Sequence, residues 1–194
     1  MAKNAIRAPD WDRLFEFAAA QDGLFTTSQA AESGYSPQLL AHHLSAGRML
    51  RVRRGIYRLV HFPAGDHEDL TTIWLWSEQV GVFSHQTALA LHDLSDILPS
   101  LLHLTLPESE RNRRLRIPDG IVLYYSDIPT NEQQWFGPVP ITAPLRTLED
   151  CARENLPPEL LRGGALDALH RGLVTRPELS MVDEALGPFG GLEP

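Results

Sequence analysis

Four arginines within eight positions give this chain its clearest chemical signal: Arg51, Arg53, Arg54 and Arg58. The segment from residue 50 to residue 59 that holds them contains no Asp or Glu. Guanidinium groups bind phosphate through paired hydrogen bonds, and phosphate contacts supply much of a protein's affinity for nucleic acid. A solvated charged surface is the alternative, and the absence of acidic residues makes it the weaker one. The segment therefore predicts a phosphate-binding element.

The same segment has the residue pattern of a β-hairpin. With Arg54-Gly55 as a two-residue turn, the expected cross-strand pairs are Arg53 with Ile56, Val52 with Tyr57, Arg51 with Arg58, and Leu50 with Leu59. One face would then hold Leu50, Val52, Tyr57 and Leu59, and the other Arg51, Arg53, Ile56 and Arg58. Arginines directly opposite each other repel unless an anion lies over them. We therefore expect an apolar face toward the core and a cationic face toward phosphate.

Two short helices are expected immediately before this hairpin. Thr26 with Gln29 fits a capping box, and the first helix should end at Gly34. Ser36 caps the second helix, which begins at residue 37 and ends near residue 46. Its polar face suits base edges in a major groove. The candidate DNA-binding residues are Thr27, Ser28, Ser36, Gln38, His42, Ser45, Arg48, Arg51, Arg53, Arg54 and Arg58.

These elements predict an α+β protein in which a winged helix-turn-helix occupies residues 1–62. A helix over residues 11–20, capped by Asp10, would precede the motif and turn Trp11, Leu14, Phe15 and Ala18 toward the core or a neighbouring domain. The polar segment 61–68 marks the domain boundary. Residues 63–194 should form a larger mixed α/β domain with a flexible tail over 187–194. Its expected helices are 70–80, a segment from residue 85, 144–153 and 158–172, and its expected strands are 101–106, 121–125 and 139–141.

Charge is divided unevenly along the 194 residues. The net charge is −8, but residues 1–60 carry +3 and the remainder −11. A cationic head on an acidic body fits an oriented approach to DNA. No apolar run has the length of a membrane span, and a single cysteine, Cys151, fits a reducing cytoplasm. We expect Cys151 to be a small buried residue.

The acidic body contains one basic cluster, formed by Arg111, Arg113, Arg114 and Arg116. Two interpretations stay open: a solvated loop balanced by Glu108 and Glu110, or a second phosphate contact. We predict no metal site at the histidine pairs and no catalytic role for the adjacent acids Glu149 and Asp150, which are expected at the surface. Nucleotidyl transfer requires a Gly-Ser turn followed by paired aspartates, and the chain contains no Gly-Ser dipeptide. Neither enzymatic activity nor a cofactor is expected.

The chain resembles the AbiE-type antitoxins of bacterial type IV toxin–antitoxin systems over about residues 10–180. The resemblance lies in the wing LRVRRGIYRL, in SHQTALALHDL, in ERNRRLRIP and in TAPLRTLEDCA. It implies a repressor that binds inverted repeats in its own promoter through Arg51, Arg53, Arg54, Gln38 and His42. It also implies a cognate nucleotidyltransferase-like toxin as partner, no membrane, and a monomer or weak dimer that pairs on DNA. The family is often basic, whereas the pI here is about 5.4. The alternative is a winged-helix regulator or protein-interaction adaptor not linked to a toxin.

Overall fold

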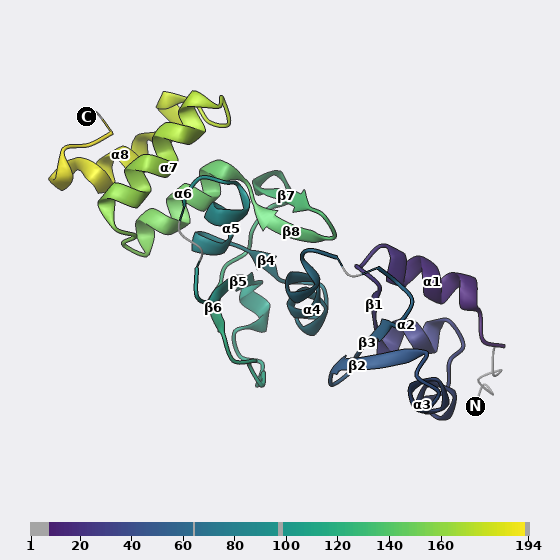
Figure 1. Cartoon of the computed structure of the whole chain (residues 1–194). Coiled ribbons are helices and arrows are strands. Elements are labelled where there is room, and N and C mark those ends of the chain that lie inside the picture. Colours follow the sequence, from purple (N-terminus) through teal and green to yellow (C-terminus); the bar gives the residue numbers. More distant parts are fainter. Residues whose placement is uncertain (1–7, 64, 97–98, 193–194) are drawn as a thin grey trace. The chain divides into compact units, whose positions relative to one another are not determined.

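The computed structural model describes residues 8–63, 65–96 and 99–192. The chain divides into two compact units, Met1–Gln79 and Val80–Pro194, which are described separately below. Figure 1 labels the helices and strands of both units.

The first unit is a winged helix-turn-helix, as predicted. Its elements in chain order are α1 (Trp11–Ala19), β1 (Leu24–Thr26), α2 (Thr27–Glu32), α3 (Pro37–Ser45), β2 (Met49–Arg53), β3 (Ile56–Leu59) and α4 (Glu68–Trp76). The three strands form an antiparallel sheet in the order β1-β3-β2, so the last strand of the hairpin is central. Leu14, Phe25, Leu40, Met49 and Leu59 belong to one buried cluster that joins α1 and α3 to this sheet.

Helix α4 packs against β1 and β3 and thereby belongs to the first unit. Thr71 Oγ1 donates to Asp22 Oδ2 at 2.6 Å, and Gln79 Nε2 donates to Gln21 Oε1 at 3.0 Å. The sequence placed the boundary after residue 62, at the polar segment. In the structure the boundary lies after residue 79, because α4 and Gln79 hydrogen-bond polar side chains in the connection between α1 and β1.

The second unit is a mixed α/β domain. Its elements are β4 (Val82–Phe83), α5 (His85–Leu91), β5 (Leu102–Leu106), η1 (Glu108–Glu110), β6 (Ile121–Tyr125), η2 (Thr130–Glu132), β7 (Gln133–Phe136), β8 (Val139–Thr142), α6 (Pro144–Arg153), α7 (Pro158–His170), η3 (Arg176–Leu179), α8 (Ser180–Leu186) and η4 (Gly187–Phe189). The strand order is β6-β5-β4-β8-β7, with β5 parallel to β6 and β4 parallel to β8. Helices α5 to α8 share a buried cluster that includes Leu89, Leu148, Leu161 and Val182. Cys151 lies in it, as expected.

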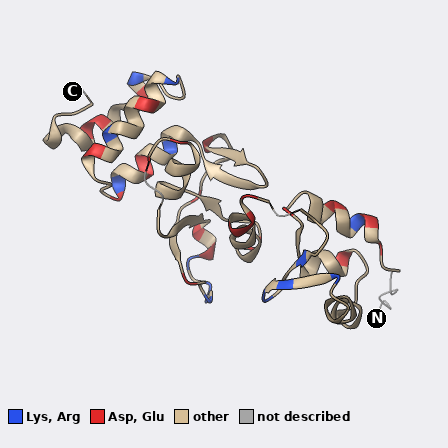
Figure 2. Cartoon of the chain, in the orientation of Figure 1, with Lys and Arg blue, Asp and Glu red and all other residues tan. Residues whose placement is uncertain are grey.

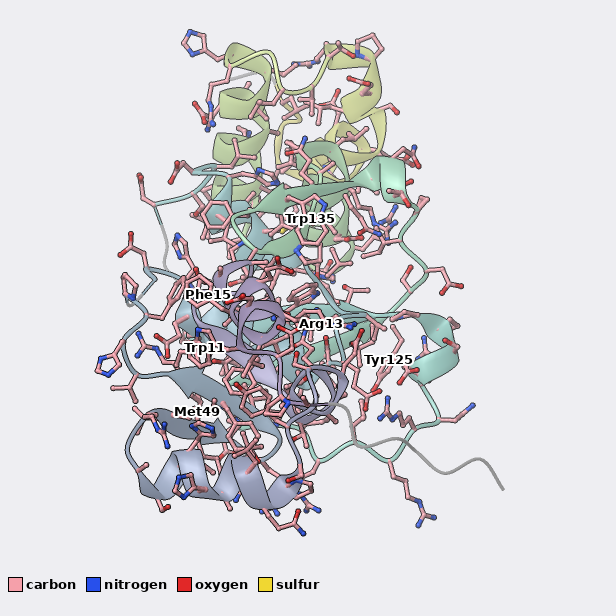
Figure 3. The ribbon with its side chains drawn as sticks, turned by 90° about the vertical axis from the view of Figure 1, so that its right-hand side faces the viewer. Trp11, Arg13, Phe15, Met49, Tyr125 and Trp135 are labelled. Carbon is pink, nitrogen blue, oxygen red and sulfur yellow. The ribbon has the colours of Figure 1, made fainter. Side chains whose placement is uncertain are left out.

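Neither Trp11 nor Phe15 packs in the core of the first unit, and the tail that was expected to be flexible is largely packed. Trp11 and Phe15 lie side by side on α1 (Figure 3) and are 48% and 43% exposed, because Leu14 and Ala18 alone face the core. The expected flexible tail is packed over residues 187–192: Leu192 is buried, and Arg162 donates to the carbonyl oxygen of Gly191 at 2.8 Å. Residues 193 and 194 lie outside the described part of the chain.

Candidate nucleic-acid interface

Local capping sets the two helices of the motif as the sequence predicted. The Thr26 hydroxyl accepts from the Gln29 amide at 3.2 Å, and the Gln29 side chain accepts from the Thr26 amide at 2.8 Å. Ser36 Oγ accepts from the Leu39 amide, which makes Ser36 a helix cap. The cap uses the hydroxyl as an acceptor and leaves its proton free to donate.

The outer face of α3 is polar and exposed. Gln38, His42 and Ser45 are exposed, whereas Leu40 on the opposite side is buried. Ala41 is exposed as well. Arg48 Nη2 lies 3.2 Å from His42 Nε2, so the guanidinium is held at the end of the same face. This helix offers amide, imidazole and guanidinium groups, which are the groups that hydrogen-bond base edges.

The hairpin contains a β-bulge that the sequence did not reveal. Arg53 pairs with Ile56 as predicted, but Arg51 pairs with Tyr57 and Leu50 with Arg58. Val52 is therefore the extra residue on β2. The predicted Arg51–Arg58 pair does not form, so the predicted repulsion between two directly opposite arginines is wrong.

The bulge reverses the faces of β2. Met49 pairs with Leu59 and fills the core, while Leu50 and Val52 are 52% and 39% exposed. On β3 the predicted alternation holds for Leu59, which faces the α1–α3 side. The other face of β3 is not open to solvent, because α4 packs on it and Ile56 is buried at 3%.

Arg58 lies on that covered face and is not available as a phosphate contact. Its Nε donates to Glu68 Oε2 at 3.0 Å, and its Nη2 donates to the Phe62 carbonyl oxygen at 3.0 Å. Its side chain is 14% exposed. We therefore remove Arg58 from the predicted DNA contacts and assign it to the packing of α4 on the sheet.

The other wing arginines are free to bind an anion. Arg51, Arg53 and Arg54 are exposed, and no carboxylate of the described residues pairs with them. Figure 2 shows basic residues and no acidic ones along the β2–β3 wing. The wing thus concentrates positive charge at its tip and on β2, next in the chain to the polar face of α3.

Thr27 and Ser28 differ in their availability. The Thr27 amide and hydroxyl both donate to the Gly55 carbonyl oxygen, at 2.9 Å and 3.3 Å, and so fasten the wing turn to the start of α2. Ser28 is exposed, and its hydroxyl lies 3.0 Å from that of Thr26. Thr27 thus positions the wing, while Ser28 can reach a ligand.

The basic loop of the second unit divides into two pairs. Arg111 donates to Glu108 at 2.8 Å, a contact that lowers the pKa of this carboxyl, and Arg113 donates to Glu110 at 3.1 Å. Arg114 and Arg116 are exposed and have no acidic partner among the described residues. Arg111 and Arg113 are thus balanced locally, as one of the two interpretations predicts, whereas a phosphate contact through Arg114 and Arg116 stays a prediction.

Asp150 corrects another expectation, because it is buried rather than at the surface, at 5% exposure. Its Oδ1 accepts from Arg146 Nε at 2.8 Å and from Arg153 Nη1 at 2.9 Å. The signal in the sequence was the spacing Arg146–Asp150–Arg153, which places all three on one face of α6. Among the described residues, no group of three His, Cys, Asp or Glu is placed to hold a metal ion.

Comparison with known proteins finds a family match within the first unit. Residues 12–60 match the family model of the AbiEi antitoxin transcriptional regulators. The match covers α1 to β3 and confirms the resemblance over the winged helix. The RV2827C protein from Mycobacterium tuberculosis has a similar crystal structure, with 14% sequence identity and a TM-score of 0.49. That alignment covers 93% of this chain and 71% of the other. No curated protein matches the sequence. No helix in the described part of the chain has the length and hydropathy needed to cross a bilayer.

Proposed function

We propose that the winged unit binds double-stranded DNA with α3 in the major groove and the wing on the phosphate backbone. The observation that carries this proposal is the trio Arg51, Arg53 and Arg54, exposed without a carboxylate partner and following the polar face of α3. Arginine supplies the phosphate contacts, and Gln38 with His42 supplies groups that hydrogen-bond base edges. Arg48 and Ser45 lie at the end of the same helix, while Ser28 and Ser36 lie at the starts of α2 and α3.

The match to antitoxin regulators supports the biological role. We infer that the protein represses its own toxin–antitoxin operon in the cytoplasm by binding inverted repeats, as a monomer or weak dimer that pairs on DNA. A nucleotidyltransferase-like toxin would be its cognate protein partner. Arg114 and Arg116 would add a phosphate contact from the second unit.

An adaptor function is the second candidate, and one observation favours it. Trp11 and Phe15 expose adjacent rings 6.4 Å apart on α1, and Phe62 lies 6.1 Å from Phe15. Exposed aromatic groups of this kind are enriched where proteins bind one another.

The deciding experiment is a mobility-shift titration of the full chain on DNA from upstream of its own gene, with a scrambled duplex as control and a salt series. We expect a sequence-dependent complex whose affinity falls steeply with salt. Equal binding to both duplexes would remove the base-reading role of α3. No complex at low salt would leave the winged unit as a protein-interaction module.

A further inference from the structure

Strand β6 lies at one edge of the five-stranded sheet in the second unit (Figure 1). It pairs with β5 without a register shift, and no strand of the described residues pairs with its other side. Edge strands of natural proteins are usually protected by a charged residue, a proline or a β-bulge. The sequence of β6, Ile-Val-Leu-Tyr-Tyr, has none of these, and each of its side chains is half-buried. This edge therefore has the composition of a strand that another strand covers.

The hydrogen bonds to β5 identify which groups of β6 point away from the sheet. The Leu102 amide donates to the Gly120 carbonyl oxygen at 2.8 Å, and the Ser126 amide donates to the Leu106 carbonyl oxygen at 3.0 Å. In a parallel ladder the N–H and C=O groups of alternate residues face the neighbouring strand. The even-numbered residues therefore bond to β5, and the odd-numbered residues direct their amide and carbonyl groups outward. These are Ile121, Leu123 and Tyr125.

The outward groups are largely open. Arg111 Nη2 donates to the Tyr125 carbonyl oxygen at 3.2 Å, which agrees with the outward direction of this group. A carbonyl oxygen has two lone pairs, so that oxygen can accept a second hydrogen bond. In the described part of the chain no hydrogen bond reaches the outward groups of Ile121 and Leu123. An extended segment can therefore pair with the whole strand.

The residues of β6 suit a second copy of the same strand in antiparallel orientation. With Leu123 on a two-fold axis, Ile121 lies opposite Tyr125 of the partner, and Val122 lies opposite Tyr124 of the partner. Pairs of an aromatic with a β-branched residue are favourable across antiparallel strands. In this register every outward group faces an outward group of the other copy, as hydrogen-bonded pairs of an antiparallel ladder require. Both the side chains and the backbone of β6 are thus complementary to β6 itself.

We propose that two copies of this chain associate through β6, by antiparallel pairing that continues the sheet from one copy into the other. The interface is isologous, so it has the two-fold symmetry of an inverted repeat. The inference deepens the proposed function and rests on it for the role of the dimer, whereas the pairing itself requires no DNA.

Association through this edge should be weak. Two strands of five residues bury less surface than a standard protein interface does. In addition, Asp119 and Asp127 flank the strand, so antiparallel pairing brings carboxylates of the two copies toward each other at both ends. Weak association agrees with a protein that pairs mainly when two copies are already bound at neighbouring sites.

The test is sedimentation velocity of the full chain without DNA, over a concentration series that reaches about 1 mM, the range of weak complexes. We expect a reversible equilibrium between monomer and dimer. Leu123→Pro should weaken it by at least about tenfold, because proline lacks the N–H that makes both hydrogen bonds on the axis. The amide of Leu123 does not bond to β5, so an edge strand tolerates proline at this position. Leu123→Ala is the matched control, because it keeps the amide and should weaken association less than proline does.

A charge exchange at the same position tests the register. Leu123→Lys and Leu123→Glu should each associate more weakly than the wild type, because equal charges meet on the axis. An equimolar mixture of the two variants should associate at least about fivefold more tightly than either variant alone. This pattern requires residue 123 to lie opposite itself. An unfolding temperature close to that of the wild type confirms that each variant folds.

A monomer at every concentration would overturn the proposal. So would a dimer that Leu123→Pro leaves unchanged, or a mixture that associates no more tightly than its components. Loss of the dimer in Trp11→Ala would also overturn it, because that result would place the interface on α1. A variant that lacks the wing arginines should associate as the wild type does, so failure of the dimer and failure of DNA binding are separate results.

Discussion

Replacing the three free wing arginines should flatten the salt dependence of DNA binding, whereas replacing the fourth should not. The perturbation is the triple variant Arg51→Gln, Arg53→Gln and Arg54→Gln, with Arg58→Gln as its matched control. All four residues belong to one hairpin, but only Arg58 is held by protein acceptors, Glu68 and the Phe62 carbonyl.

The magnitude follows from the number of free guanidinium groups. Each phosphate contact contributes about 0.9 to the slope of log K against log salt, so three contacts contribute about 2.7. Raising the salt fourfold, from about 50 to 200 mM, should therefore cost the wild type about 40-fold in affinity that the triple variant does not lose. Arg53→Gln alone should reduce the slope by about one unit for every DNA sequence.

Arg58→Gln should instead destabilise the first unit. It leaves Glu68 and the Phe62 carbonyl without their donor in a partly buried position, which costs about 1–3 kcal/mol. Fluorescence anisotropy over a salt series measures the first effect, and urea unfolding the second. A slope unchanged in the triple variant, or lowered by about one unit in Arg58→Gln, would refute the assignment of these four residues.

Three other predictions concern specificity, backbone conformation and pH. Gln38→Ala should relax sequence preference by about 1–3 kcal/mol at one base pair, measured with a set of single-base operator variants; unchanged preference would remove Gln38 from base recognition. Gly47→Ala should lower the free energy of unfolding in urea by about 1–2 kcal/mol, because the backbone φ is +67° although the added Cβ would meet no other atom. Gly23→Ala should lower it further, because its Cβ would also lie 2.7 Å from the Phe62 ring. Equal costs would mean that the ring moves away freely. His85 has a folded pKa of about 3, below its unfolded value, so the unfolded chain gains a proton first as the pH falls. The contribution of neutral His85 to the free energy of unfolding is therefore fully present above about pH 6.5 and decreases toward pH 3. At pH 5 the loss from this residue should be about 2 kcal/mol. His85→Gln should lose less stability than the wild type between pH 7 and pH 5, and an identical loss would contradict the buried neutral state.

Sequence reasoning succeeded where structure is determined within a few residues. The capping pair Thr26–Gln29 and the Ser36-Pro37 helix start have the contacts that their spacing predicts. Thr175 and Glu178 form a further capping pair at the same spacing, and it opens a 3-10 turn ahead of α8. Each of these signals involves a hydrogen bond between groups three residues apart, so neighbouring sequence suffices to specify it.

The wing could not be predicted in the same way, because its register depends on segments far along the chain. Thr27 ties the turn at Gly55 to α2, and Met49 must face the core opposite Leu59. Both conditions are met when Val52 forms a β-bulge. Neither condition can be read from the alternation of polar and apolar residues in the segment 50–59. Helix α4 covers the second face of the sheet, so Arg58 has an internal partner that no local pattern indicates.

The buried face of α6 also could not be predicted from the sequence pattern alone. Thr142 precedes this helix but does not cap it, because its hydroxyl lies 2.6 Å from that of Thr147 and Ala143 is the N-cap residue. Asp150 was expected at the surface because acids on helices usually are. Two arginines at helical spacing compensate its charge, and such compensation is what permits a carboxylate to be buried.

The acidic composition is compatible with DNA binding once the range of electrostatic forces is considered. At physiological ionic strength charges more than about 8 Å apart in solvent are largely screened. The net charge of −8 sums residues over the whole chain, whereas a phosphate group meets only the charges beside it. On the wing those charges are three exposed arginines without acidic partners. As salt is lowered the screening length increases, and the acidic residues of the second unit then begin to oppose association. The wild-type plot of log K against log salt should therefore curve and flatten below about 50 mM, where the Debye length exceeds about 14 Å. A plot that stays linear to lower salt would mean that the acidic charge stays away from the DNA in the complex.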